Sequence, residues 1–388
     1  MDLKLHSKSL MNSIISLRLF LVLGIMIFSL PSLGQQKYQK ILELSYENGP
    51  MISNGKDWAD EIRDLVSYRG ADIRLGWRKT SNNFYNKLYR YPTFGIGFST
   101  ALPYYPEIGR PQGVYGFGEF PFSNKNLDKK LYLAYFAQLG LGFNLNPYDS
   151  LDNPLNQYIG SELNAYIHFG FKANYRLNQD FELFSTIGLK HYSNGATKRP
   201  NAGINLAPIA FGVRYNIDKI SPEPLRSIDY PELEKRGYWN FALYLGSKNY
   251  EVGGPSYFRG GFGVNYLWDA SYKYRIGLGL DYFIAPGFES RYPGREGTFS
   301  NQSSLAIVGS WEWKLNDRLY MPIGLGAYLH YNSENQESWF YERIGVRYKI
   351  NEHLFGGLQI KAHKAKADFF EFTIGYTIPG KIQKVVGN

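Results

Sequence analysis

Hydrophobic and polar residues alternate along much of this chain, with the period of two that is typical of a strand with one apolar face. In the second half, Ile276, Leu278, Leu280 and Tyr282 are separated by glycine or polar residues. The same alternation recurs over residues 319–329 and 370–378. Such segments number about eight between residues 40 and 216 and about eight more between 239 and 378. The pattern therefore predicts an all-β protein.

The length of the segments and the composition narrow this class. Each segment approaches the roughly 9 to 11 residues that a tilted membrane strand requires. Aromatic residues make up 17% of the chain, which has 33 Tyr and 26 Phe, and glycine is also abundant, with 41 residues. An apolar outer face, a polar lumen and aromatic girdles are typical of membrane barrels. We expect an antiparallel transmembrane β-barrel of the outer-membrane type, with about 16 strands in two related halves. The pattern leaves open one large barrel or two eight-stranded barrels.

The connections between segments alternate in length, which indicates an orientation. Tight turns at 177–180, 316–317 and 350–352 take turns with longer segments at 48–69, 146–158, 193–203 and 285–302. Outer-membrane barrels place short turns in the periplasm and long loops outside. The strand over residues 181–192 then runs outward and ends level with the outer leaflet.

The first 34 residues have the pattern of a secretory signal. Lys4, Lys8 and Arg18 precede an apolar run of 12 residues over 19–30, and small residues follow before Gly34. This run is short for a spanning helix, so a cleaved signal peptide over 1–34 is favoured over an anchor. The absence of cysteine excludes disulfides and thiolate metal sites. We expect localisation in the outer membrane of a Gram-negative bacterium.

Charge and organisation add two further expectations. Without the signal, which holds three Lys or Arg and one Asp, the formal charge falls from +9 to about +7. No basic run with interleaved aromatics appears, so nucleic acid is not an expected partner, whereas anionic lipid head groups are. Residues 217–238, rich in proline and charge, are expected to link a first half (35–216) to a second (239–388). The sequence before His191 is echoed before His363, which suggests a duplication.

One constellation carries chemistry. His191 and Ser193 continue the apolar, lipid-facing side of the strand over 181–191, and Asn205 begins the apolar face of the next strand. Ester cleavage by a serine needs a hydroxyl, a base, a group that orients the base and donors for the oxyanion. Ser193, His191 and Asn205 supply the first three in this order, and Asn194 could donate to the oxyanion. We therefore expect an esterase that acts on membrane lipid.

The segment from His191 to Asn205 resembles the active-site region of the outer-membrane lipid A 3-O-deacylases, the PagL-type or acyloxyacyl hydrolase-like family. The resemblance implies an eight-stranded barrel with His191 as base, Ser193 as nucleophile and Asn194 as oxyanion donor. Lys198, Pro200, Asn201, Gly203 and Ile204 match the pattern that follows. The usual third member in this family is Glu, and Asn205 stands at that position. The implied substrate is lipid A of lipopolysaccharide, cleaved without a cofactor.

The substrate contacts follow from placement. Lys198 and Arg199 lie beside the site, where basic side chains could hold lipid A phosphates. The acyl chain would lie along the outer wall formed by Leu183, Ile187, Leu189, Ile209 and Phe211. The second half lacks the constellation, because alanine follows His363 at the serine position and the His363 side chain shares a face with Gln359 and Lys361. We expect it to be degenerate and non-catalytic.

Two alternatives stay open at the level of sequence. The Ser-His pair could be a polar contact at the barrel rim, in a non-enzymatic channel, adhesin or structural barrel. The substrate could instead be phospholipid. His168, His330 and His353 have no partners at ligand spacing, so no metal site is expected. The sequence does not define an oligomeric state.

Overall fold

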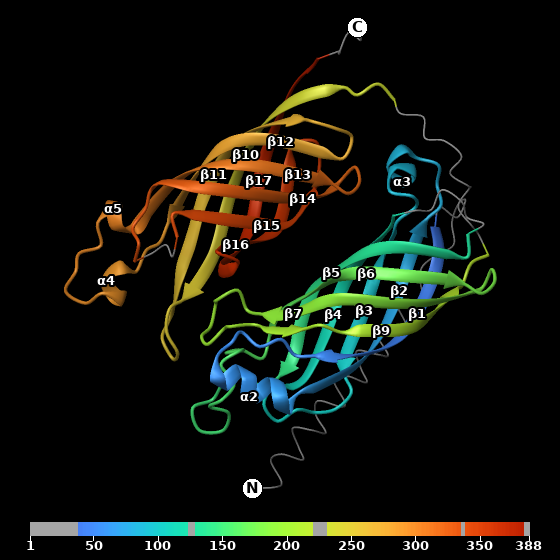
Figure 1. Cartoon of the computed structure of the whole chain (residues 1–388). Helices are drawn as coiled ribbons and strands as arrows, with labels where there is room; N and C mark the ends of the chain where they lie inside the picture. Colours follow the sequence, from blue (N-terminus) through green and yellow to red (C-terminus); the bar gives the residue numbers. More distant parts are fainter. Residues whose placement is uncertain (1–37, 123–128, 220–230, 335–337, 384–388) are drawn as a thin grey trace. The chain divides into compact units, whose positions relative to one another are not determined.

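The computed structural model describes residues 38–122, 129–219, 231–334 and 338–383. The signal peptide expected over 1–34 and most of the linker expected over 217–238 lie outside these ranges. None of the helices in the described ranges has the length and apolarity needed to cross a membrane. Figure 1 shows two barrels, the first coloured blue to green and the second yellow to red.

The first barrel is built from strands that are neighbours in sequence and pair antiparallel, and the pairing of the first strand, β1, with the last, β9, closes the ring. Pro208 separates β8 from β9, and β7 pairs with both, so together they fill one strand position. Its elements are β1 (Tyr38–Pro50), α2 (Asp57–Leu65), β2 (Ser67–Lys79), α3 (Phe84–Leu88), β3 (Thr93–Ala101), β4 (Gly109–Pro121), β5 (Leu131–Leu145), β6 (Asn164–Arg176), β7 (Phe181–Ser193), β8 (Ile204–Leu206) and β9 (Ile209–Asn216).

The second barrel is closed by the pairing of its first strand with its last. Its elements are β10 (Lys235–Asn249), β11 (Ser256–Asp269), β12 (Tyr274–Ile284), α4 (Phe288–Arg291), α5 (Phe299–Gln302), β13 (Ser303–Lys314), β14 (Leu319–His330), β15 (Phe340–Lys349), β16 (Leu354–His363) and β17 (Lys366–Gln383). The expected fold class is confirmed, and the open choice is settled in favour of two eight-stranded barrels. Strand β10 begins within the range expected for the linker.

The lumen of the first barrel is filled by charged side chains, because the polar face of each strand points inward. Near its centre, Lys172 Nζ lies 2.6 Å from Glu43 Oε1 and 2.8 Å from Glu119 Oε2. Arg214 lies 2.6 Å from Glu119 Oε2 and 2.5 Å from Glu43 Oε1. These groups are almost fully buried, and each charge has an opposite partner, as burial of ions requires. The lumen is therefore a packed polar core.

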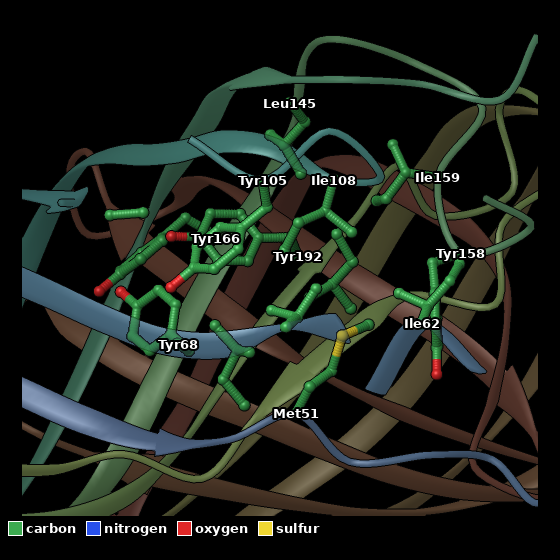
Figure 2. Packing of buried hydrophobic residues seen from close by; sticks show 14 of the residues in the cluster. Met51, Ile62, Tyr68, Tyr105, Ile108, Leu145, Tyr158, Ile159, Tyr166 and Tyr192 are labelled. Carbon is green, nitrogen blue, oxygen red and sulfur yellow. The ribbon is translucent and has the colours of Figure 1, made fainter. Parts of the chain in front are cut away.

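At the end of this lumen where β1 connects to β2, charged side chains give way to apolar ones. Buried Tyr, Ile and Leu side chains form an apolar cluster there, to which α2 contributes Ala59 and Ile62. Figure 2 shows Ile62 within this cluster. Helix α2 is short, and this burial of apolar surface is what stabilises it. The apolar cluster also includes Tyr192, Ile204 and Leu206 from the strands that carry the candidate site. The site thus stands on a rigid, well-packed end of the barrel.

Candidate active site

Strand β7 presents the candidate residues through simple alternation. Glu182 and Lys190 are buried in the lumen, where Lys190 pairs with Glu47. Residues of the opposite parity face outward, and Leu183 and Ile187 are 43% and 59% exposed. His191 has this outward parity and is half-buried. An imidazole therefore stands on the outer wall, at the loop end of the strand.

Asn205 comes to His191 through the pairing of β7 with β8. The two residues are direct partners in the register, and Ile204 and Leu206 on either side of Asn205 are buried in the core. His191 Nδ1 lies 2.7 Å from Asn205 Oδ1. An amide oxygen only accepts, so Nδ1 carries the hydrogen and donates it. This tautomer leaves the Nε2 lone pair of a neutral imidazole available as a base.

Gly203 forms the surface against which the imidazole packs. Its φ is +81°, and a Cβ added at this position would lie 2.5 Å from His191 Cε1. Any larger residue would therefore displace the ring. The contact was not expected from sequence, where Gly203 was noted only as part of the family pattern.

Ser193 lies two residues beyond His191 on the same face of β7, opposite Ala165 of β6. Residues at this spacing on a strand have Cα atoms roughly 6.5 to 7 Å apart, within reach of a His–Ser hydrogen bond. Within the described residues, Ser193 Oγ makes no hydrogen bond with His191, and the Ser193 side chain is buried. The structure thus brings His191 and Asn205 into contact and aligns Ser193 beside them.

Asn194 organises the loop that follows. Its Nδ2 donates to Ser161 Oγ at 2.8 Å and to the Lys198 carbonyl at 2.9 Å, and its backbone N–H donates to Asn201 Oδ1 at 3.1 Å. The amide hydrogens of Asn194 are therefore engaged within the loop and with Ser161. The Nδ2 group of Asn201 makes no hydrogen bond among the described residues, and its orientation is fixed because Oδ1 accepts from Asn194. Sequence reasoning noted Asn201 without giving it a role.

Two neighbouring loops hold the site segment from outside. The Gly203 N–H donates to the Tyr158 carbonyl at 2.9 Å, and the Ile52 N–H donates to the Asn205 carbonyl at 2.8 Å. Tyr158 in turn packs edge-on against Trp58 of α2, with 4.7 Å between ring centroids. Burial raises the pKa of the Tyr158 hydroxyl to about 12, so it stays protonated and donates to the Ala59 carbonyl at 3.2 Å. Helix α2 is thereby connected to the residues around His191.

Comparison with known proteins defines the family. A family model described as lipid A 3-O-deacylase (PagL) matches residues 71–214, and one described as acyloxyacyl hydrolase, C-terminal domain, matches residues 237–381. The two matches span most of both barrels. The chain belongs to the lipid A 3-O-deacylase (PagL) family. The sequence resemblance is confirmed, and it extends beyond the first half, to which it had been assigned.

Solved structures with similar folds are outer-membrane proteins of low sequence identity. The outer membrane enzyme PagL is 15% identical, with a TM-score of 0.30, over 44% of this chain and 97% of its own. Neisserial surface protein A is 12% identical, with a TM-score of 0.28, over 46% and 97%. A BenF-like porin from Pseudomonas fluorescens Pf-5 is 7% identical, with a TM-score of 0.24, over 89% and 99%. No curated protein sequence matches the chain. The family assignment rests on the two family models.

The wall below the site in this deacylase-family barrel is apolar. Ile187 of β7 is paired with Phe171 of β6 on one side and with Ile209 of β9 on the other. All three are exposed, as is Phe211 at 66%, while Leu189 is half-buried. A continuous apolar surface thus leads from His191 toward the middle of the barrel wall. At the loop end, Lys198 is exposed and Arg199 is half-buried.

The second barrel places its corresponding histidine differently. His363 is buried in the lumen with Lys361, and Tyr328 Oη lies 3.0 Å from His363 Nε2. Gln359 is buried on the same face of β16. Within the described part of the chain, no three His, Cys, Asp or Glu side chains gather where they could hold a metal ion. The outward His and Ser arrangement is a feature of the first barrel.

Proposed function

We propose that this chain is an outer-membrane serine esterase that removes an ester-linked acyl chain from lipid A at the outer leaflet. The observation that carries the proposal is the 2.7 Å contact between His191 Nδ1 and Asn205 Oδ1 on the outward wall, two residues from Ser193. Membership of the lipid A 3-O-deacylase family supports the same reaction. Polar groups on a lipid-facing wall are costly, so the half-buried His191 and Asn205 side chains at one place on this wall need a reason.

The reaction follows the chemistry of a serine nucleophile. Ser193 Oγ attacks the ester carbonyl carbon while its proton passes to His191 Nε2, and Asn205 holds the imidazole in the required tautomer. The intermediate collapses as the proton passes from Nε2 to the leaving sugar oxygen, which leaves an acyl-serine. A water then attacks the acyl-serine and gives a proton to Nε2. This proton passes to Ser193 Oγ as the bond between Ser193 and the acyl group breaks, which releases the fatty acid and restores the enzyme. No cofactor enters these steps.

Stabilisation of the oxyanion falls to the loop after Ser193. Asn194 is the donor that the sequence suggests, through its side chain or its backbone N–H. The hydrogen bonds of the loop favour Asn201 Nδ2, because Asn194 already donates to Ser161, Lys198 and Asn201. Removal of an oxyanion donor costs about 10²- to 10³-fold in kcat. Asn201→Ala and Asn194→Ala therefore distinguish the two assignments by which one loses turnover in a folded barrel.

The substrate reaches the site from the membrane. Its acyl chain lies along the wall formed by Leu183, Ile187, Leu189, Ile209 and Phe211, with the ester beside Ser193. Lys198 and Arg199 contact the phosphates of lipid A, since ammonium and guanidinium groups bind phosphate directly. Fixing both ends of the substrate in this way supplies the proximity that ester attack requires.

Mass spectrometry of lipid A from cells with and without the chain tests the proposal. We expect Ser193→Ala and His191→Ala to abolish acyl loss while the barrel still folds, as measured by heat-modifiable migration on gels. Ser185→Ala is the matched control, because Ser185 is an outward serine on the same strand. Unchanged acyl loss in Ser193→Ala would reject the assignment. Release of ordinary fatty acids alone would indicate phospholipid as the substrate, and unaltered lipid A with conductance in planar bilayers would indicate a channel.

A further inference from the structure

The excess positive charge of the first barrel does not lie in its lumen. Among the residues that the structure describes, five basic and five acidic side chains are buried there, so their charges balance. They are Arg74, Arg78, Lys172, Lys190 and Arg214 with Glu43, Glu47, Asp72, Glu119 and Glu182. The net positive charge of this barrel must therefore come from the residues at its two rims.

The two rims differ in sign. We call the end with the connections β2–β3, β4–β5 and β6–β7 the turn rim, and the opposite end the loop rim. The described part of the turn rim holds eight basic residues and two acidic ones. The basic residues are Lys40, Lys79, Lys87, Arg90, Lys129, Lys130, Arg176 and Lys219, and the acidic ones are Asp180 and Asp218. The described part of the loop rim holds six basic residues and eight acidic ones. The basic residues are Lys56, Arg63, Arg69, Arg110, Lys198 and Arg199, and the acidic ones are Asp57, Asp60, Glu61, Asp64, Glu107, Asp149, Asp152 and Glu162.

Aromatic side chains border the turn rim on the outer wall. Tyr38, Tyr175, Phe181 and Tyr215 are 40 to 43% exposed, and the rings of Phe181 and Tyr215 lie 5.2 Å apart. Exposed aromatic residues at strand ends are typical of the boundary between hydrocarbon and head groups. The basic side chains next to them, of which Lys129, Lys130 and Lys219 are exposed, thus stand at the level of lipid phosphates.

We propose that the turn rim of the first barrel binds the anionic head groups of glycerophospholipids in the periplasmic leaflet. Short connections of outer-membrane barrels face the periplasm, so this rim lies in the leaflet opposite to lipid A. Its charge is complementary to an anionic phospholipid surface, where each Lys or Arg contributes about 1 kcal/mol to attraction. The inference does not depend on esterase activity, since it concerns the opposite end of the barrel.

Native mass spectrometry of the full chain tests the inference. The protein in a zwitterionic detergent is offered equal amounts of phosphatidylglycerol and phosphatidylethanolamine, and the bound lipids are counted. We expect the wild type to prefer phosphatidylglycerol, and the preference to fall about fivefold for each charge removed at low salt. Lys129→Glu, Lys130→Glu and Lys219→Glu together should abolish it. The preference should also weaken in high salt, because screening shortens the range of these charges.

A matched triple variant on the loop rim provides the control. Lys56, Arg69 and Arg110 are also exposed, and their replacement by Glu changes the net charge equally. We expect this variant to keep the preference for phosphatidylglycerol. Equal losses in both variants, or no preference in the wild type, would overturn the inference. Displacement of the lipid by soluble glycerol phosphate at millimolar concentration would also overturn it, because the rim would then bind free anions.

Discussion

At the scale of single residues, the feature that sets this site apart is the neutral amide at position 205. Asn205 Oδ1 lies 2.7 Å from His191 Nδ1, but in the proposed reaction the amide would carry no charge to stabilise an imidazolium at His191. We expect Asn205→Asp, which has the same size, to raise the rate of acyl release about tenfold or more. Asn205→Leu removes the acceptor of the His191 hydrogen bond, and it should lower the rate of acyl release at least tenfold. Initial rates with purified lipid A measure both, and equal rates for Asn, Asp and Leu would show that position 205 has no role in orienting His191.

A second residue-scale prediction concerns the backbone beneath the imidazole. Gly203→Ala would place a Cβ 2.5 Å from His191 Cε1, so the ring must move away from its position beside Ser193. We expect acyl release to fall at least tenfold, on the scale of losses that follow misplacement of a reacting group. Gly55→Ala is the control, because Gly55 has nearly the same φ of +80° and nothing within 4 Å of an added Cβ. Similar losses in both variants would mean that backbone strain, and not the contact with His191, limits the rate.

The sequence predicts the positions of His191 and Ser193 but not the roles of Gly203 and Asn201, because the first depend on local alternation and the second on the path of a loop. The outward parity of His191 and Ser193 follows from the strict alternation of β7, which requires only local sequence. The contact of Gly203 with His191 and the orientation of Asn201 depend on a loop whose path includes left-handed backbone at Gly195, Ala196 and Gly203. No periodicity encodes such a path. The loop also depends on Tyr158 and Ile52, which are far away in sequence.

At the scale of elements, the helices are the parts that the pattern did not predict, and α2 is the longest of those in the described residues. Residues 48–69 were expected to be a long connection, and within them Asp57–Leu65 forms a helix. A helix this short is only marginally stable by itself. Its stability comes from Ala59 and Ile62, which are buried in the apolar cluster at one end of the lumen. Such tertiary stabilisation leaves little trace in local sequence. Most strands, in contrast, repeat their alternation over ten residues or more and could be recognised directly.

The link from α2 to the site can be measured by hydrogen exchange. The Trp58 ring packs on Tyr158, whose carbonyl accepts the Gly203 N–H. An aromatic pair contributes about 0.5 to 1.5 kcal/mol beyond buried area, so Trp58→Ala should speed exchange about two- to tenfold in α2 and at Gly203. Leu65→Ala is the control on the same helix, because Leu65 is 55% exposed. Faster exchange in α2 without any change at Gly203 would show that the helix is not coupled to the site.

At the scale of the whole molecule, the number of barrels could not be predicted from the alternation. A period of two defines the faces of a strand but says nothing about which strand closes the ring. Closure is decided by the partners of the terminal strands, and β1 pairs with β9 while β10 pairs with β17. These contacts join residues more than a hundred positions apart. Each half therefore completes its own lumen, and the two lumens hold different networks of charge.

The different placement of the two corresponding histidines, His191 and His363, leads to the last prediction. His363 occupies the position in the second half that echoes His191, yet it is buried in the lumen beside Lys361 and Tyr328. We infer a structural role for His363, because Tyr328 Oη lies 3.0 Å from its Nε2 within a buried polar core. We expect His363→Ala to leave lipid A deacylation unchanged and to destabilise the second barrel by about 1 to 3 kcal/mol, through the partners left unsatisfied. His191→Ala should show the opposite pattern, with activity lost and stability retained. Lipid A mass spectra and unfolding in denaturant measure the two effects, and loss of acyl release in a folded His363→Ala protein would assign chemistry to the second barrel.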